Sequence, residues 1–173
     1  MVLGMTLSTF TLLHVIISLI GIGSGLVVLY GLLVGKRLDG ITAIFLLSTV
    51  LTSVTGFLFP FEHLLPSHKV GIISLVLLAI AILARYSFHL AGVWRSTYVV
   101  SAVMSLYLNC FVLVAQAFLK TPALHALAPT GKEPPFLATQ LALLALFVVL
   151  TILAVKRFKI ADSAADSGRR KAA

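Results

Sequence analysis

The sequence has very few charged side chains for its length. Only 10% of its 173 residues are Asp, Glu, Lys or Arg, whereas 60% are hydrophobic, and a soluble domain typically carries about 25% charged residues. The mean hydropathy is +1.13. A water-soluble core cannot bury so much apolar surface, so lipid must be the solvent for most of the chain. The composition therefore indicates an integral membrane protein.

Cysteine and recognisable catalytic motifs are equally scarce. The single cysteine, Cys110, lies in an apolar run, so the chain can form neither an internal disulfide nor a cysteine-based zinc motif. No Cys-x-x-Cys-His is present, which excludes covalently attached haem c. No Ser-His-Asp order, phosphate-binding loop or pair of carboxylates is apparent either. The sequence therefore favours a protein without enzymatic chemistry.

Five apolar segments are long enough to cross a bilayer as helices, which takes about 20 residues. No basic residue precedes Lys36, so the N-terminal segment lacks the positive region of a signal peptide and is expected to be a retained span. We predict an all-α fold, a polytopic transmembrane helix bundle in which residues 1–159 form one domain. Its five spans are expected at residues 10–35, 41–59, 70–88, 97–119 and 136–155. The polar segment 160–173 lacks apolar periodicity, which predicts a disordered cytoplasmic tail.

The cations are divided unevenly between the two faces that five spans create. Three lysines lie on the face of the N-terminus, namely Lys69, Lys120 and Lys132. The other face carries Lys36, Arg37, Arg85, Arg95, Lys156, Arg157, Lys159, Arg169, Arg170 and Lys171. Because loops rich in Lys and Arg remain cytoplasmic, we predict a multi-pass protein of the cell inner membrane with its N-terminus outside. The net charge of +8 is then directed at anionic lipid, and nucleic acid is not an expected partner.

Polar side chains concentrate in the outer half of the predicted bundle. His14 lies in the first span, roughly 6–12 Å below the outer boundary at 1.5 Å per residue. The second and fourth spans carry Thr49, Thr52, Ser53, Thr55, Ser101, Ser105, Asn109 and Gln116. An ionisable residue in the membrane is a functional hypothesis by default, although hydroxyl and amide side chains also serve only to pack helices. Gly21 and Gly25, four residues apart, predict a close contact between helices.

A histidine-containing stretch, FPFEHLLPSHKVG, forms the predicted outer turn above these polar groups. His14 together with His63 or His68 would supply the two axial imidazoles of a haem b. Asn109 and Gln116 would then be hydrogen-bond partners around the cofactor. The sequence therefore predicts a redox-type membrane protein with its site in the outer half of the membrane.

A transition metal is a second interpretation of the same region. Imidazole and carboxylate groups bind copper or zinc, and the outer loops supply Glu62, His63, His68 and His125. His63 and His68 are five residues apart, however, which is not the spacing of a helical ligand pair. Two other interpretations remain open. In the first, the chain is an accessory or assembly subunit that packs against a larger membrane complex or a second copy of itself. In the second, it is a small transporter. The transporter is disfavoured because no Asp or Glu lies within a predicted span.

Three stretches, FPFEHLLPSHKVGIISL, ARYSFHLAGVWRSTYV and SLYLNCFVLVAQAF, resemble segments of small bacterial polytopic inner-membrane proteins of unassigned activity. The resemblance covers most of residues 59–136 and implies a helical membrane fold, with no catalytic residue to carry over. The start of the third span, His68-x-x-Gly71, is similar to that of predicted haem-binding membrane proteins. This second resemblance implies a haem ligand as an expectation.

Overall fold

The structure is built from helices alone over the residues that it describes. A computed structural model describes residues 4–59 and 66–172, and the side chains of residues 4–59 and 68–158. The elements in these ranges are α1 (Leu7–Leu33), α2 (Asp39–Gly56), α3 (Pro66–Ile82), the π-helical turn η1 (Leu83–Ser87), α4 (Val93–Lys120), α5 (Pro122–Leu127) and α6 (Pro134–Ala172).

The predicted number of membrane spans is confirmed. Among the described residues, five helical segments are long and apolar enough to cross a membrane: Leu7–Leu33, Asp39–Gly56, His68–Ser87, Val93–Lys120 and Pro134–Phe158. Large apolar side chains cover their outer surfaces, as they must where the surrounding solvent is hydrocarbon. The predicted boundaries differ from the observed ones by a few residues at most ends. Helix ends depend on capping and packing, which hydropathy does not report.

The helix boundaries follow from the local sequence. The Thr6 hydroxyl accepts a hydrogen bond from the Thr9 amide and caps the start of α1. Gly35 adopts a positive φ of 71° just beyond the end of that helix, a conformation that glycine tolerates best. Asp39 lies in the first turn of α2, where an acidic group favours the helix dipole. Pro122 and Pro134 are the first residues of α5 and α6, where proline is well accommodated.

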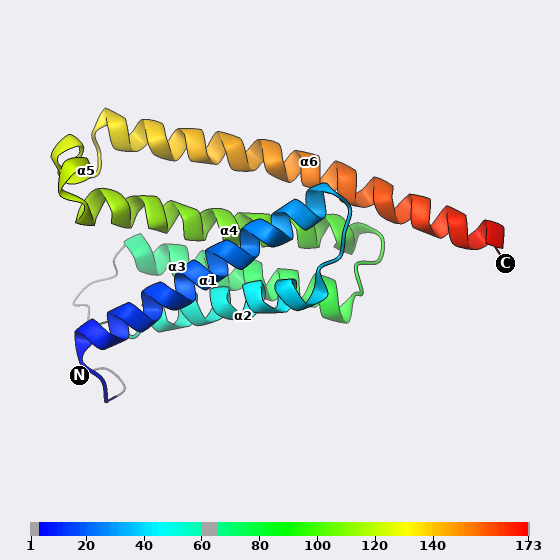
Figure 1. The fold of residues 1–173 in the computed structure, drawn as a ribbon, viewed down its shortest axis with the longest axis horizontal. Helices are drawn as coiled ribbons and strands as arrows, with labels where there is room; N and C mark the ends of the chain where they lie inside the picture. The colour runs from blue at the N-terminus through cyan, green and yellow to red at the C-terminus, as the bar shows by residue number, and fades with distance from the viewer. Residues whose placement is uncertain (1–3, 60–65, 173) are drawn as a thin grey trace.

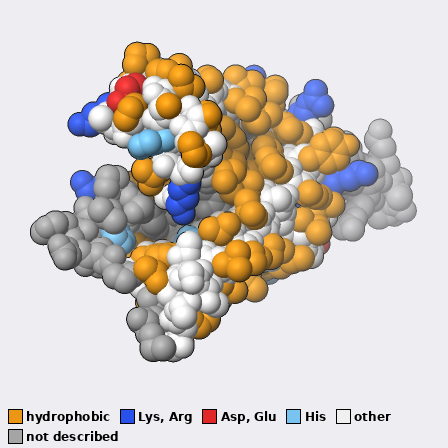
Figure 2. Space-filling view, turned by 60° about the vertical axis from the view of Figure 1, so that its left-hand side comes forward, with side chains coloured by type: hydrophobic (Ala, Val, Ile, Leu, Met, Phe, Trp, Pro, Cys, Tyr) orange, Lys and Arg blue, Asp and Glu red, His pale blue; other side chains and the backbone are white. Residues whose placement is uncertain are grey.

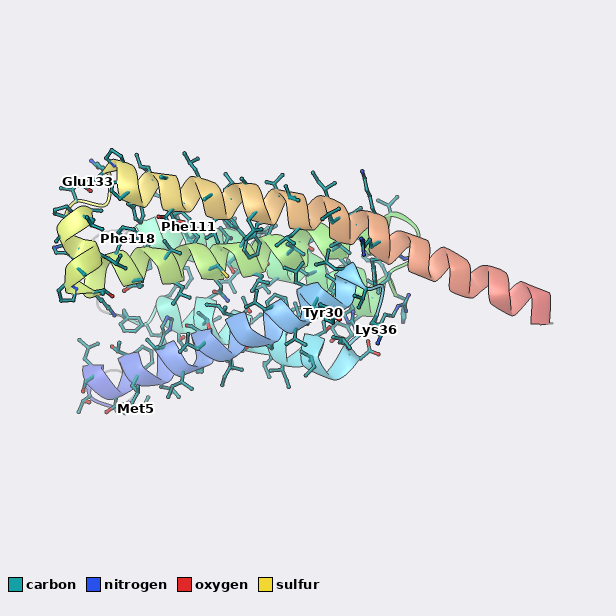
Figure 3. The ribbon with its side chains drawn as sticks, turned by 45° about the horizontal axis from the view of Figure 1, so that its top comes forward. Met5, Tyr30, Lys36, Phe111, Phe118 and Glu133 are labelled. Carbon is teal, nitrogen blue, oxygen red and sulfur yellow. The ribbon has the colours of Figure 1, made fainter. Side chains whose placement is uncertain are left out.

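Helix α4 lies in the centre of the bundle. Half of its spanning window is buried, whereas only 11% of the α6 window is, so α6 is the peripheral helix. Figure 1 shows α6 along one side of α4, with α1, α2 and α3 on the other side and the two termini at opposite ends. The short helix α5 connects α4 to α6 at the end where α1 begins. Figure 3 shows Met5 and Glu133 at this end and Tyr30 with Lys36 at the other.

The four helices α1 to α4 leave a cavity at one end of the group and pack closely at the other. The cavity end comprises the start of α1, the end of α2, the start of α3 and the end of α4. The packed end comprises the opposite termini of the same four helices. At the packed end, a Cβ atom on Gly25 would lie 2.6 Å from Leu106 Cδ1 and 2.9 Å from the Phe45 ring. The close helix contact predicted from Gly21 and Gly25 is therefore confirmed.

The link between the third and fourth spans ends in a strained turn. The third helix does not stop at Arg85 but continues through Ser87 as one π-helical turn. His89 and Leu90 then adopt left-handed φ values of 50° and 59°, which are uncommon for residues other than glycine. The Leu90 side chain is buried, and packing of this kind can hold such a turn. The Arg85 side chain is buried here and forms an ion pair with Asp39.

Helix α6 continues through Ala172. Its last part contains several Ala, Lys and Arg residues and no proline, a composition that is compatible with helix. The disordered cytoplasmic tail expected over residues 160–173 stays a prediction.

Candidate functional site

A cavity of about 230 Å³ lies between α1, α2, α3 and α4 at the cavity end. Its walls are mainly apolar. Figure 2 shows a hollow on this side of the molecule with basic and histidine side chains around it. All four helices contribute polar residues to the lining: Thr11, His14, Ser18, Thr52, Ser53, His68, Ser74, Asn109, Gln116 and Lys120. An apolar cavity with a few convergent polar groups is the usual form of a small-molecule site.

His14 is hydrogen-bonded to the second helix through the Thr55 hydroxyl, 2.8 Å from the ring nitrogen Nδ1. The same hydroxyl lies 2.7 Å from the Leu51 carbonyl. With the hydroxyl proton donated to Leu51, Thr55 accepts from His14 Nδ1, and Nε2 carries the lone pair. Nε2 has no hydrogen-bond partner among the described residues, and the half-buried ring lines the cavity. The site thus contains one oriented hydrogen-bond acceptor.

An aromatic wall supports the His14 ring. Phe59 lies edge-on to it, with ring centroids 5.2 Å apart and an interplanar angle of 90°. The same Phe59 contacts the buried Phe10 ring at 5.0 Å. These contacts, together with the Thr55 bond, restrict the imidazole to one orientation. A restricted ring loses less freedom when a ligand binds, which favours affinity.

The depth of His14 can be compared with that of Gln116 by counting along the helices. A Cβ atom on Gly21 would lie 3.2 Å from Thr49 Oγ1 and 3.5 Å from Asn109 Nδ2, so these residues share one level. His14 precedes Gly21 by seven residues, and Gln116 follows Asn109 by seven. At 1.5 Å per residue on helices that run in opposite directions, both lie about 10 Å nearer the cavity end. His14 and Gln116 therefore line the cavity at a similar level.

His68 is brought to the same cavity as His14. It is only 4% exposed, and its ring centroid lies 5.5 Å from that of Phe57. The neighbouring Gly71 has a packing role, because a Cβ atom there would approach the Phe57 ring to 3.1 Å. The spacing His68-x-x-Gly71 is thus explained by the contact of α3 with Phe57.

The two amides predicted to surround a cofactor are both in the lining. Asn109 Nδ2 donates to Thr49 Oγ1 across the helix interface at 3.4 Å, while Gln116 is exposed and faces the cavity. The hydroxyls of Ser101 and Ser105 instead donate to carbonyls one turn earlier in α4. Those two serines therefore satisfy their own helix, as the packing interpretation predicts.

The predicted metal set is only partly described. Glu62 and His63 lie outside the described residues, and His125 is exposed on α5 and does not line the cavity. Within the described part of the chain, no group of three or more His, Cys, Asp and Glu side chains could hold a metal ion. Of the predicted ligands that the structure describes, His14 and His68 line the same cavity, whereas His125 does not.

Haem can be tested against the size of the cavity. An engineered cavity of about 150 Å³ holds a benzene molecule, so 230 Å³ suits one substituted ring. A tetrapyrrole has four pyrrole rings around its iron and needs far more room. The volume therefore favours a smaller ligand over a haem bound between His14 and His68.

Lys120 is a site residue that the sequence analysis does not single out. It is the last residue of α4 and the charged member of the described cavity lining. It follows Gln116 by four residues, which places the two on one face of the helix. That spacing is the signal in the sequence that would have identified it.

Comparisons with known proteins leave the site without a precedent. No protein-family model matches the chain, and searches of curated proteins and of solved structures found no match. The resemblances drawn from short stretches of the sequence therefore remain expectations. What the site can do must be argued from its own residues.

Proposed function

We propose that this protein is an inner-membrane binding protein for a small, mainly apolar molecule, held in the cavity between α1, α2, α3 and α4. The observation that carries the proposal is the oriented His14, whose Nδ1 is hydrogen-bonded to Thr55 and whose Nε2 has no partner among the described residues. Helix packing alone does not require an apolar cavity beside a ring nitrogen that lacks a partner in the described part of the chain. A ligand-binding site requires both the cavity and such a nitrogen.

The size and chemistry of the cavity define the ligand. Its volume of about 230 Å³ matches one ring or a short branched chain, by comparison with the benzene-sized cavity above. The mainly apolar walls favour a molecule that partitions into lipid, and the polar lining residues orient it. A haem b held by His14 with His63 or His68 is the narrower prediction from sequence, and the cavity volume supports it less. The transition-metal alternative uses Glu62, His63, His68 and His125.

The distribution of charge supports the proposed orientation. Among the residues whose side chains are described, the side of the packed end carries Lys36, Arg37, Arg85 and Arg95, together with Lys156 and Arg157 of α6. The side of the cavity end carries Lys69, Lys120 and, in the loop before α6, Lys132. The positive-inside rule then makes the cavity end the outer one. A reporter enzyme fused to the C-terminus should be active only in the cytoplasm. Activity of that fusion outside the membrane would reverse the orientation.

Ligand binding can be tested with a photoreactive apolar probe. An alkylbenzene that carries a diazirine should label peptides of α1 and α4 in the full-length protein reconstituted in lipid nanodiscs. Val112 lines the cavity, so Val112→Trp should fill it and remove most of the labelling. Val100 is exposed on the same helix and outside the lining, so Val100→Trp is the matched control. Equal labelling of both variants would show that the probe binds elsewhere and would reject the proposed site.

A further inference from the structure

The cavity separates a hydrogen-bond acceptor from hydrogen-bond donors. With the Thr55 hydroxyl donating to the Leu51 carbonyl, His14 Nδ1 carries the ring proton and Nε2 is the acceptor. Gln116 lies at a similar level on the facing helix, and Lys120 lies one turn further toward the mouth, about 6 Å along α4. The Gln116 amide can donate or accept, whereas the Lys120 ammonium can only donate. A ligand that satisfies both His14 Nε2 and Lys120 must therefore offer a donor to α1 and an acceptor to α4.

The apolar walls limit what can lie between these groups. Val112 and Leu108 of α4 and Ile22 of α1 contribute to the lining, so the middle of the ligand must be hydrophobic. A planar ring with oxygen substituents has an apolar face and polar edges. Its size also agrees with the cavity volume of about 230 Å³.

We infer that the ligand is a hydroxylated single-ring headgroup of the phenol or hydroquinone class, a conclusion that rests on the proposed function. One ring hydroxyl donates to His14 Nε2, and an oxygen at another edge accepts from Gln116 or Lys120. Lys120 further favours this class because a nearby cation stabilises partial negative charge on a phenolic oxygen. Any alkyl substituent extends along the apolar wall.

A fatty acid or another anionic amphiphile fits the same cavity less well. Its carboxylate would pair with Lys120 but would offer no donor to His14 Nε2. The imidazole nitrogen would then be left facing hydrocarbon without a partner, which is unfavourable for a buried polar atom. The two ligand classes therefore differ in their dependence on His14.

Competition against the photoreactive alkylbenzene separates the ligand classes. Three competitors of equal alkyl length are needed: a hydroquinone, its dimethyl ether and a carboxylate. The ether keeps the ring and loses both donors, so it should compete about tenfold less well than the hydroquinone, the loss expected for one buried hydrogen bond. The carboxylate should also compete less well than the hydroquinone.

Matched variants assign the difference to named residues. His14→Phe keeps an aromatic ring without nitrogen. In this variant the hydroquinone should compete with the probe no better than its dimethyl ether does. His125→Phe replaces an exposed histidine outside the cavity and should leave the tenfold preference intact. Lys120→Met should weaken competition by the hydroquinone more than competition by its ether, whereas Lys132→Met should change neither. If His14→Phe fails to fold, Thr55→Val removes the group that orients the imidazole and should reduce the same preference.

Two results would overturn the inferred ligand class. One is equal competition by the hydroquinone and its ether, and the other is a stronger carboxylate whose effect depends on Lys120 but not on His14. In either case, loss of probe labelling in Val112→Trp but not in Val100→Trp would still support a ligand cavity. Failure of the ligand class and failure of the proposed function are therefore distinguishable.

Discussion

The two ends of the α1–α4 group are built from the same four helices but differ in how completely they are packed. At the packed end, Gly25 allows Phe45 and Leu106 to approach the α1 backbone, and the space between them would not hold a water molecule. At the cavity end, hydroxyl, amide and imidazole groups replace large apolar side chains, and about 230 Å³ stays open. Small polar residues thus leave room for a ligand where larger apolar ones would close the interface.

The two ends also differ in whether their cations are buried and paired or exposed to solvent. The packed end holds a buried cation, Arg85, that forms an ion pair with Asp39 and lies over the Tyr98 ring at 5.2 Å. At the cavity end, the described cations Lys69, Lys120 and Lys132 are all exposed. A charge that is buried and paired contributes to a specific structure, whereas an exposed charge remains available to a ligand.

The largest effect is expected from adding a methyl group at the packed end. In Gly25→Ala the new Cβ would lie 2.6 Å from Leu106 Cδ1 and 2.9 Å from the Phe45 ring, so these two packed side chains must shift. Overpacking of this kind typically costs about 1–3 kcal/mol, and thermal unfolding in detergent should report a clearly lower Tm.

The same substitution should be harmless where space exists. Gly23 has no atom within 4 Å of the added Cβ, and at the cavity end Gly56 has only His14 Cε1 at 3.8 Å. Gly23→Ala and Gly56→Ala are therefore expected to preserve or raise the Tm, because alanine is the better helix former. Equal destabilisation of all three variants would remove the proposed difference between the two ends.

The ion pair at the packed end should respond asymmetrically to mutation. Asp39→Asn leaves the buried Arg85 cation without its partner, whereas Arg85→Met leaves Asp39, whose side chain is 81% exposed to solvent. An unpaired buried charge is the costly product, so Asp39→Asn should lower the free energy of unfolding by about 1–2 kcal/mol. Arg85→Met should have the smaller effect in the same denaturation measurement, and the reverse order would contradict this account.

The interhelical hydrogen bond of the Asn109 amide, at the level of Gly21, should contribute less to the free energy of unfolding. Thr49→Val removes the acceptor of the Asn109 bond, and such bonds in membranes average about 0.6 kcal/mol. Thr52 is the control on the same helix, because its buried hydroxyl has no partner among the described residues. Thr52→Val should therefore be neutral or slightly stabilising. Double-mutant analysis with Asn109→Leu would show whether Thr49 and Asn109 are coupled.

The smallest effect concerns a loop beyond the cavity end. The Thr130 hydroxyl and amide and the Lys132 amide donate to Glu133 and lower its pKa from 4.5 to about 2. Because the pKa is lower in the folded state, the stabilisation is complete above about pH 4.5 and is lost as the pH falls toward 2. NMR titration should show this low midpoint, and Thr130→Val should raise it. An unchanged pKa in Thr130→Val would exclude the proposed hydrogen bonds.

Helix type, the number of spans and the uneven placement of cations could all be predicted from the sequence. Each depends on local free energies, since transfer of about 20 consecutive apolar residues into lipid is decided within the segment. The concentration of polar groups near His14, Asn109 and Gln116 was predictable for the same reason, by counting residues along helices.

The bonds that define the site depend on tertiary structure. His14 and Thr55 are 41 residues apart, and whether they meet depends on how α1 and α2 are rotated against each other. The same holds for the place of Lys120 in the lining and for the contact of Gly71 with Phe57. Hydropathy determined which residues enter the membrane, because transfer from water is additive along the chain. Only the packing of all four helices decided which hydroxyl His14 meets and where space remains, because rotation, tilt and side-chain fit act together.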